Sequence, residues 1–434
     1  MYQSFMSVGK VPADWKAAFI TPLFKKGASS DPSNYRPVSL TSVFSKLMER
    51  VIVTNLLNYL SSHKLINKQQ HGFLSRRSTS TNLLESLNDW SLCVENGKCQ
   101  QVAYIDFAKA FDSVCHSKLI AKLRMYGICG SLLQWIDDFL SGRSHQTKVG
   151  NSLSEVLYII SGIVQGSCLG PILFLLYIND LPDIFNEEVT LKLFADDVKL
   201  YSNIAVASSY TPTSLAEQLN KLAKWATDWQ LPIAFSKCCV FNIGSKTPQP
   251  TPCIFDSGSM PSVEEVVDLG VTLHKSLKFS SHVSAICCKA HRRANLILKC
   301  FYSKDASSLL SAFITYVRPI LEYCCVVWNP FLVKDINAIE SVQRRFTKRI
   351  PCMRNLTYCQ RLRELGIESL ELRRLRADLL FTYKLVFDIL DMDVSEFFTM
   401  QFDDKRRGHC YKLYLPSCKS CVRYNCSSQR VIRF

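Results

Sequence analysis

The chain has 434 residues, of which 47% are hydrophobic and 21% are charged, so it is neither disordered nor collagen-like and is long enough for two or three packed units. Its 52 Lys and Arg outnumber its 37 Asp and Glu, and the net charge of +15 favours a polyanionic partner such as nucleic acid over a basic protein without one. The longest apolar run, 172–178, is far below the roughly 20 residues of a membrane span, so no membrane partner is expected.

The start of the chain and its cysteines indicate a reducing compartment. Residues 1–16 contain neither a long apolar core nor a small-residue cleavage site, which together mark a secretory signal. The 19 cysteines are odd in number, and pairs such as Cys238–Cys239 occur within apolar stretches, so buried thiols are a better interpretation than disulfides. We therefore expect a nuclear or cytoplasmic protein, not a secreted one.

The hydrophobic pattern predicts mixed helices and strands, followed by a mostly helical region. Residues 1–45, which contain Pro12, Pro22, Pro32 and Pro37, are expected to be loop-rich. In chain order the predicted elements are a helix over 41–63, a helix over 78–95, a strand over 101–106, a helical segment over 116–141, a strand over 155–160, a helix over 168–180, strands over 189–194 and 198–203, a helix over 213–229, strands over 237–243 and 265–273, and helices over 285–301 and 309–323. This order predicts an α+β fold with a boundary near residue 280.

The first long helix, 41–63, is placed by the spacing of its apolar residues. They recur with a period near 3.6 and are expected to form its buried face: Val43, Leu47, Val51, Leu56, Leu57 and Leu60. Thr41 or Ser42 is the candidate residue for capping its N-terminus.

Carboxylates in apolar surroundings are the clearest chemical feature of the sequence. Asp106 ends the apolar run 102–105, and Asp196 and Asp197 separate two further apolar runs. Burying carboxylates is costly unless a cation or a donor compensates, so a shared divalent metal is favoured, although an Asp-Asp pair can also simply form a turn. Oxygen-only ligation favours Mg²⁺, and two such ions would clamp the attacking and leaving oxygens of a phosphoryl transfer.

Short motifs occur in one order along nearly the whole chain. They are NYRPVSL at 34–40, QHGF at 70–73, YIDFAKAFD at 104–112, SGIVQGSCLGP at 161–171, FADD at 194–197, the stretch 231–237 and LGV at 269–271. Together they resemble the motifs of reverse transcriptases of non-LTR (LINE-type) retrotransposons. The resemblance implies an α+β right-hand polymerase fold with an antiparallel sheet. Residues 1–280 would form the fingers and palm, 281–335 a helical thumb-like region, and 336–434 a basic helical C-terminal region.

The resemblance also implies a catalytic and metal-binding set. Asp106, Asp196 and Asp197 would hold two Mg²⁺ ions, or Mn²⁺ in their place, together with the backbone carbonyl of Phe107. Lys237 matches the lysine proposed in polymerases to protonate the leaving pyrophosphate.

Two further residues of the YIDFAKAFD motif have different expected roles. Phe111 occupies the position that packs under the sugar and rejects a 2′-OH by steric clash, with core packing as the alternative. Asp112 is expected to be structural and to cap the next helix, with Ser113 nearby.

The resemblance implies a nucleotide pocket around these motifs. Gln165 and Gly166 would lie against the incoming base and the template strand, since glycine allows a close backbone approach. Arg36, with Lys25 or Lys26, would hold the triphosphate, and a solvated surface charge is the alternative for each of these basic residues.

Two clusters stand out in the helical end of the chain. The basic cluster suits a surface that tracks phosphates, with an exposed basic helix face as the alternative; its residues are Arg344, Arg345, Lys348 and Arg349. The second cluster could suggest a zinc site, but its irregular spacing favours free thiols; its residues are His409, Cys410, Cys418, Cys421 and Cys426.

The predicted function is that of an RNA-directed DNA polymerase, with an RNA template, a DNA primer and dNTPs as partners. The resemblance further suggests target-primed reverse transcription. No endonuclease domain is recognised ahead of the polymerase motifs, so a copy truncated at both ends is expected. The alternatives are a catalytically inactive nucleic-acid-binding remnant and, with less support, a splicing cofactor of the intron-maturase kind. The pattern predicts no oligomeric state.

Overall fold

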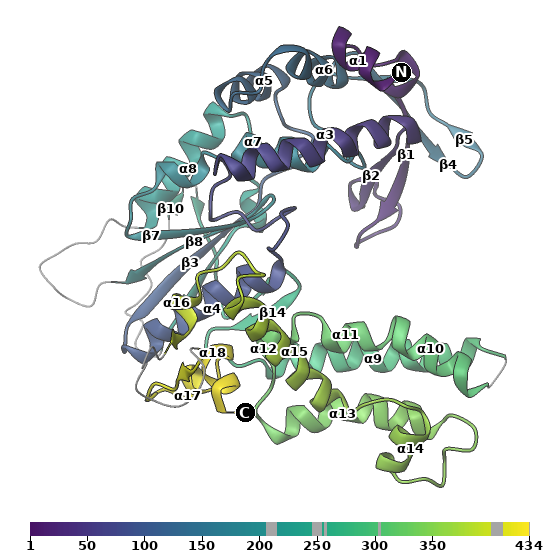
Figure 1. Ribbon diagram of the computed structural model, residues 1–434, viewed down its shortest axis with the longest axis vertical. Helices are drawn as coiled ribbons and strands as arrows, with labels where there is room; N and C mark the ends of the chain where they lie inside the picture. Colours follow the sequence, from purple (N-terminus) through teal and green to yellow (C-terminus); the bar gives the residue numbers. More distant parts are fainter. Residues whose placement is uncertain (205–214, 245–253, 256–257, 303–304, 401–410, 434) are drawn as a thin grey trace, which may run out of the picture.

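The computed structural model describes residues 1–204, 215–244, 254–255, 258–302, 305–400 and 411–433. Its elements form an arc (Figure 1), with helix α3 (Val43–Ser62) and strands β1 (Ala17–Phe24) and β2 (Tyr35–Leu40) on one arm and most of the C-terminal helices on the other. A five-stranded sheet lies between the two arms.

This central sheet has the strand order β12–β9–β3–β8–β7. Its strands are β3 (Cys99–Ile105), β7 (Val189–Phe194), β8 (Asp197–Ile204), β9 (Cys239–Ile243) and β12 (Ser262–Val263). All neighbours pair antiparallel except β12 with β9. The α+β fold class is confirmed, and so are the strands predicted over 101–106, 189–194, 198–203 and 237–243.

Apolar cores pack against both faces of the central sheet. On β3, Val102 belongs to one core and Ala103 to the other, as the alternation of side chains along a strand requires. Helix α4 (Thr79–Glu95) contributes Trp90 to the first core, and helix α7 (Gly170–Ile178) lies almost wholly inside the second. The sheet is therefore held between two helical layers.

The helical segment predicted over 116–141 is two helices. Gly127 and Gly130 have φ angles of +78° and +64° and interrupt it, because positive φ cannot continue a right-handed helix. The remaining helices before residue 280 are α1 (Tyr2–Val8), α2 (Ala13–Lys16), α5 (His116–Met125), α6 (Gly130–Leu140) and α8 (Leu215–Asp228), with short 3₁₀ turns at Pro32–Asn34, Leu181–Ile184 and Phe235–Lys237. Residues 213–214 of the predicted helix over 213–229 lie outside the described residues.

The prediction that residues 1–45 are loop-rich is wrong. They contain α1, α2, β1 and β2, and β1 also pairs with a strand far along the chain. The strands that complete this second sheet are β4 (Arg143–Val149), β5 (Ser152–Leu153) and β6 (Leu157–Ile159). Pro22 lies opposite Pro37 in the β1–β2 pair. Residues opposed at a non-hydrogen-bonded position need no N–H, so two facing prolines are compatible with an antiparallel pair.

Helix α3 buries only part of the predicted face: Leu56 and Leu60 are buried as predicted, but its first turns are rotated away from it. Three residues of the predicted buried face are exposed, namely Val43, Leu47 and Val51. The buried residues are Ser45, Met48, Glu49, Ile52, Leu56 and Leu60. The Glu49 carboxylate accepts hydrogen bonds from the backbone N–H groups of Cys168 (2.7 Å) and Leu169 (3.2 Å). These two N–H groups lie just before the N-terminus of α7, where the helix dipole favours a negative charge. The contact with Glu49 therefore fixes the rotation of α3 about its own axis.

The stretch 265–273 is a hairpin and not the single strand that was predicted. Strands β13 (Glu265–Asp268) and β14 (Val271–His274) pair antiparallel. Leu269 and Gly270 join them with φ angles of +45° and +84°, which reverse the chain direction.

From residue 280 the described chain is mostly helical, as predicted. Its helices are α9 (Ser280–Cys300), α10 (Ala306–Tyr316), α11 (Arg318–Glu322), α12 (Cys325–Trp328), α13 (Val333–Lys348), α14 (Tyr358–Glu364), α15 (Leu370–Val386), α16 (Val394–Phe397), α17 (Cys421–Tyr424) and α18 (Ser427–Arg430), with a 3₁₀ turn at Val431–Arg433. The short strands are β10 (Ile254–Phe255), β11 (Gly258–Ser259), β15 (Thr399–Met400) and β16 (Leu413–Tyr414). The helix predicted over 309–323 is divided at Val317 into α10 and α11.

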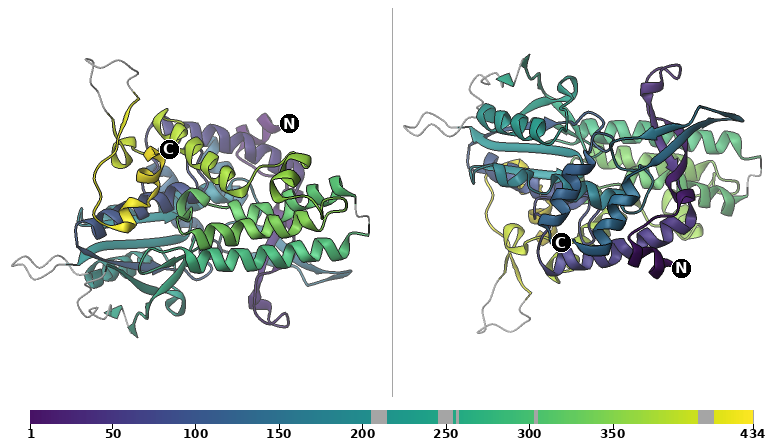
Figure 2. Two further views of the ribbon diagram at one scale, coloured as in Figure 1. Left: turned by 90° about the horizontal axis from the view of Figure 1, so that it is seen from below. Right: turned by 90° about the horizontal axis from the view of Figure 1, so that it is seen from above.

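The C-terminal helices pack on one another and on the central sheet. Helices α9 and α13 lie side by side (Figure 2). Leu309, Phe313 and Val342 belong to the same core as Trp90 of α4, so this region shares a core with the sheet. The three-part division at residues 280 and 335 stays a prediction. Among the described helices, none is both long and apolar enough to span a membrane.

Candidate active site

The Asp-Asp pair lies at the tight turn that joins β7 to β8. Phe194 pairs with Asp197, and Ala195 and Asp196 form the turn between them. Ala195 has a φ of +55°, a left-handed conformation that is uncommon for a residue with a side chain. The turn therefore needs support from the surrounding structure.

Asp106 lies beside this turn because β3 and β8 are neighbours. Ile105 pairs with Val198 in this antiparallel pair. Asp106, which follows Ile105, is therefore brought next to Asp197, which precedes Val198. The main chain of Asp106 is fixed from the other side, where its carbonyl accepts a hydrogen bond from Ala234 N at 2.8 Å. Phe107 forms an isolated antiparallel bridge with Ile233.

Lys237 donates a hydrogen bond to Asp106 through its ammonium group, with Nζ 2.9 Å from Oδ1. Its side chain is 61% exposed, so its charged end remains open to solvent. The charge of Lys237 acts on Asp196 as well and offsets part of the upward shift of its pKa that burial causes. The structure thus places Lys237 beside Asp106, and its predicted role in catalysis stays a prediction.

The carboxylates repel one another. Burial and the charge of Asp106 raise the pKa of Asp196 above its usual range, while the charges of Arg36 and Lys237 oppose the shift. Asp197 is still in part exposed to solvent. Its partial withdrawal from water raises its pKa to about 6, and the charges of Asp196 and other carboxylates add to this shift. Such a concentration of negative charge attracts cations.

The donor set suits a cation that also takes ligands from solvent and substrate. Within the described ranges, no group of three or more His, Cys, Asp or Glu side chains could hold a metal ion alone. Mg²⁺ is commonly held by one or two carboxylates and completes its shell with water and substrate phosphates. The unrelieved repulsion among Asp106, Asp196 and Asp197 fits such a site.

A polar cavity of about 160 Å³ lies next to the carboxylates. Asp106, Asp197 and Asp268 are among its lining residues. Asp268 accepts hydrogen bonds from Lys199 Nζ at 2.8 Å and from the Tyr104 hydroxyl at 3.1 Å. The sequence analysis did not identify Lys199 or Asp268, because nothing local to either residue shows that the β13–β14 hairpin brings them together.

The SGIVQGSCLGP loop is attached to β2. The carbonyl of Gln165 accepts a hydrogen bond from Ser39 N at 2.8 Å. Gly166 has a φ of +113°, and a Cβ there would lie 2.6 Å from Ser39 O, so contact with β2 alone requires glycine. The prediction that Asp112 caps the next helix is wrong: α5 begins later, after Cys115, and the Asp112 carboxylate accepts a hydrogen bond from Gln165 Nε2 at 2.8 Å.

Phe111 is held by other rings. It stacks on Phe174 of α7, with centroids 4.4 Å apart and planes 17° apart, and Phe73 meets it edge-on at 6.4 Å. The ring is half-buried, so one part packs in the core and another part stays accessible.

The predicted phosphate-binding residues lie on the first arm. Arg36 on β2 is exposed, and its charge offsets part of the upward shift of the Asp196 pKa. Lys25 and Lys26 are exposed just beyond the end of β1.

The C-terminal cysteines Cys418, Cys421 and Cys426 are free thiols. Cys418 Sγ donates a hydrogen bond to Gln429 Oε1 at 3.3 Å. His409 and Cys410, the other members of this cluster, lie outside the described residues.

Comparison with known proteins gives one family and several relatives. The family model described as "Reverse transcriptase (RNA-dependent DNA polymerase)" matches residues 24–273, more than half of the chain. A probable RNA-directed DNA polymerase from transposon BS of Drosophila melanogaster is 28% identical over 385 residues, covering 83% of this chain and 40% of that protein. The RNA-directed DNA polymerase from mobile element jockey of the same species is 27% identical, covering 81% of this chain and 39% of that protein. The chain thus spans about two fifths of the length of these relatives.

Among solved structures, telomerase from Candida tropicalis in complex with a fragment of telomeric RNA is similar to this chain. The TM-score is 0.47 at 10% sequence identity, with 88% of this chain and 59% of that one covered.

Replacing Asp197 by Asn is expected to stabilise the metal-free protein at neutral pH. The carboxyl ionises near pH 3.8 when unfolded and near 6 when folded, so above pH 6 its charge destabilises the folded state. Solvent screening limits the gain to about 1–2 kcal/mol at pH 7.5. Unfolding of both proteins in EDTA at pH 7.5 and pH 4.5 measures it. The gain should shrink at the lower pH, and a destabilised variant at pH 7.5 would contradict the electrostatic account.

Proposed function

The chain belongs to the reverse transcriptase (RNA-dependent DNA polymerase) family, and we propose that it adds deoxynucleotides to a primer 3′-OH on an RNA template. The observation that carries this proposal is the meeting of Asp106, at the end of β3, with Asp196 and Asp197 at the β7–β8 turn. Carboxylates at adjacent strand ends are the ligands that a phosphoryl transfer assisted by two divalent ions needs.

Asp106, Asp196 and Asp197, with the carbonyl of Phe107, are the residues that would hold two Mg²⁺ ions, or Mn²⁺ in their place. When bound, these ions would neutralise negative charge on the attacking and leaving oxygens. The mutual repulsion of the carboxylates supports this assignment, since bound cations would relieve it.

The remaining site residues bind and orient the substrates. Lys237 would hold a proton at Nζ for the leaving pyrophosphate, and its contact with Asp106 keeps it at the site. Arg36, with Lys25 or Lys26, would bind the triphosphate. Gln165 and Gly166 would lie against the incoming base and the template, on a loop that β2 and Asp112 hold in place.

Helices α9 and α13 supply a surface for the nucleic acid. A cavity of about 620 Å³ between them is lined by Arg292, Arg345, Lys348 and Arg349. Residues 341–354 contain no Asp or Glu, so nothing within this segment offsets its charge. Such a surface suits the phosphates of an RNA template paired with a DNA primer. The resemblance of the motifs to those of non-LTR retrotransposons further suggests that the reaction would be target-primed reverse transcription.

Asp196→Asn should abolish primer extension while leaving nucleic-acid binding unchanged, because it removes a metal ligand and no phosphate contact. Extension of a DNA primer on an RNA template with dNTPs and Mg²⁺, beside a gel-shift assay, measures both. We expect a loss of at least about 10³-fold. Asp137→Asn, at an exposed residue of α6, is the matched control and should extend normally. Normal extension by Asp196→Asn would overturn the site assignment.

Phe111→Val should relax discrimination against ribonucleotides. A smaller side chain opens space where a 2′-OH would lie, and the ratio of rNTP to dNTP incorporation should rise by about 10- to 100-fold. Incorporation of a single nucleotide opposite one template base measures this ratio. Phe174→Val removes the stacking partner of Phe111 and is the packing control. If both variants raised the ratio equally, the effect would come from loosened packing and not from the Phe111 ring.

Arg345→Gln combined with Lys348→Gln should weaken binding of primer-template and make it less sensitive to salt. Each lost phosphate contact should reduce the slope of log K against log salt by about 0.7–0.9. Binding titrations at several salt concentrations measure the slope. Arg124→Gln combined with Lys64→Gln serves as the control. It removes two exposed charges, one on α5 and one just after α3. An unchanged slope in the first variant would show that this surface does not contact the nucleic acid.

A further inference from the structure

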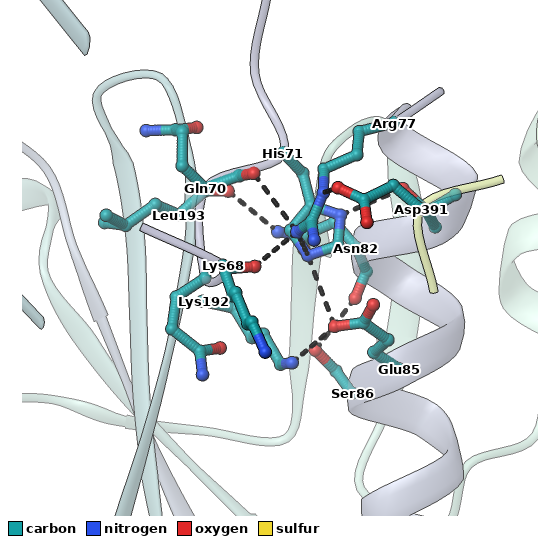
Figure 3. Close-up of polar contacts among 12 residues, drawn as sticks. Lys68, Gln70, His71, Arg77, Asn82, Glu85, Ser86, Lys192, Leu193 and Asp391 are labelled. Atoms are coloured by element: carbon teal, nitrogen blue, oxygen red, sulfur yellow. Dashed lines mark hydrogen bonds and ion pairs between the residues drawn. The ribbon is translucent and has the colours of Figure 1, made fainter. Parts of the chain in front are cut away.

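The strained β7–β8 turn is supported by the side chain of Gln70. Its Oε1 accepts hydrogen bonds from Ala195 N at 2.9 Å and from Gly72 N at 2.7 Å. Gln70 is 2% exposed, and Figure 3 shows its side chain near the β7–β8 hairpin. Because Oε1 accepts from two N–H groups, the orientation of the Gln70 amide is fixed: a flipped amide would point its NH₂ group at these two donors.

The backbone next to Gln70 approaches the same turn closely. A Cβ on Gly72 would lie only 2.4 Å from Ala195 N, so glycine is required here. One residue earlier, His71 N donates to Leu193 O at 2.9 Å, and Asn82 Nδ2 donates to the same carbonyl at 3.0 Å. The segment 68–72 thus holds both the turn and the strand that leads into it.

Buried charges hold this segment against the sheet. Glu85 of α4 lies between His71, whose Nε2 is 3.2 Å from its Oε2, and the ammonium group of Lys192 on β7. Burial opposes the charge of Glu85, but the hydrogen bond from His71 and the charge of Lys192 lower its pKa to about 2. The three side chains, visible in Figure 3, therefore link α4, the segment 68–72 and β7 by contacts that persist at neutral pH.

Arg77 connects the segment 68–72 to the C-terminal region. Its side chain is 7% exposed, and its Nη1 donates to the carbonyls of Lys68 and, at 3.3 Å, Gln70. Its Nε donates to Asp391 Oδ2 at 2.7 Å, which neutralises a guanidinium largely withdrawn from water. Asp391 lies between α15 and α16, more than three hundred positions along the chain.

We propose that Gln70 is a positioning residue for the Asp196–Asp197 turn and that Asp391 braces it through Arg77. This inference rests on the proposed function. Without the Gln70 oxygen, the buried N–H groups of Ala195 and Gly72 lose their acceptor, and the positive φ of Ala195 loses the side-chain hydrogen bond made to its N–H. The carboxylates would then shift, and a misplacement of about 1 Å can cost about 10²-fold in rate.

The test compares Gln70→Met with Gln69→Met in primer extension on an RNA template. Methionine has a similar size and no amide oxygen. Among the described residues, the Gln69 side-chain oxygen accepts no hydrogen bond, in contrast to that of Gln70, so its variant is a matched control. We expect Gln70→Met to lower kcat by about 10- to 100-fold, with KM for dNTP and the Kd for primer-template within about twofold of the wild type. Gln69→Met should match the wild type in all three values.

A second pair of variants decides the question if Gln70→Met does not fold. Asp391→Asn removes the counter-charge of Arg77. Asp388→Asn removes the ion pair between Arg76 and a second aspartate of the segment between α15 and α16. Both carboxylates are exposed, so neither change should unfold the protein. Asp391→Asn should lower kcat by about two- to fivefold at unchanged KM, and Asp388→Asn should not.

Three results would overturn the inference. They are a folded Gln70→Met with wild-type kcat, an equal loss in Gln69→Met, and, where Gln70→Met does not fold, equal rates for the two aspartate variants. No extension by the wild-type protein would instead overturn the proposed function, together with the inference that rests on it. The two failures are therefore distinguishable.

Discussion

The structure depends on holding like charges together at the edge of the central sheet. Asp196 and Asp197 repel Asp106 and one another, and each is partly withdrawn from water. The register of β3 with β8 makes this proximity unavoidable. The positive charges of Arg36, Lys237 and Lys199 offset only part of the repulsion. Bound cations would reduce this repulsion and stabilise the site. The electrostatic repulsion among the carboxylates is thus connected with their proposed role in binding metal ions.

Rigid surroundings keep the charges in place. Apolar cores cover both faces of the sheet, and the core that includes α4 continues into the C-terminal helices. Polar contacts add direction to this packing: Glu49 anchors the start of α7, and Gln70 anchors the turn. The ion pair between Arg77 and Asp391 joins the far end of the chain to this framework. In the proposed account, this ion pair is the link through which the C-terminal region braces the site.

The sequence predicted the strands around Asp106 and Asp196 because short apolar runs flanking a carboxylate are a local pattern. It did not predict the β1–β2 pair, since Pro22 and Pro37 argue against strands until their register shows that they face each other. The role of Gln70 was also missed. Its motif was recognised, but the partner of its side chain lies 125 positions away, and no local pattern encodes that contact.

The most direct test of the account is the sequence of the DNA made on two RNA templates that differ at a single position. The purified chain would extend the same DNA primer on each template with all four dNTPs and Mg²⁺. The account predicts two products that differ only at the complementary position. Addition that ignores the template would contradict it. So would no synthesis by a folded protein that binds RNA in a salt-sensitive way, which would identify a nucleic-acid-binding remnant without polymerase activity.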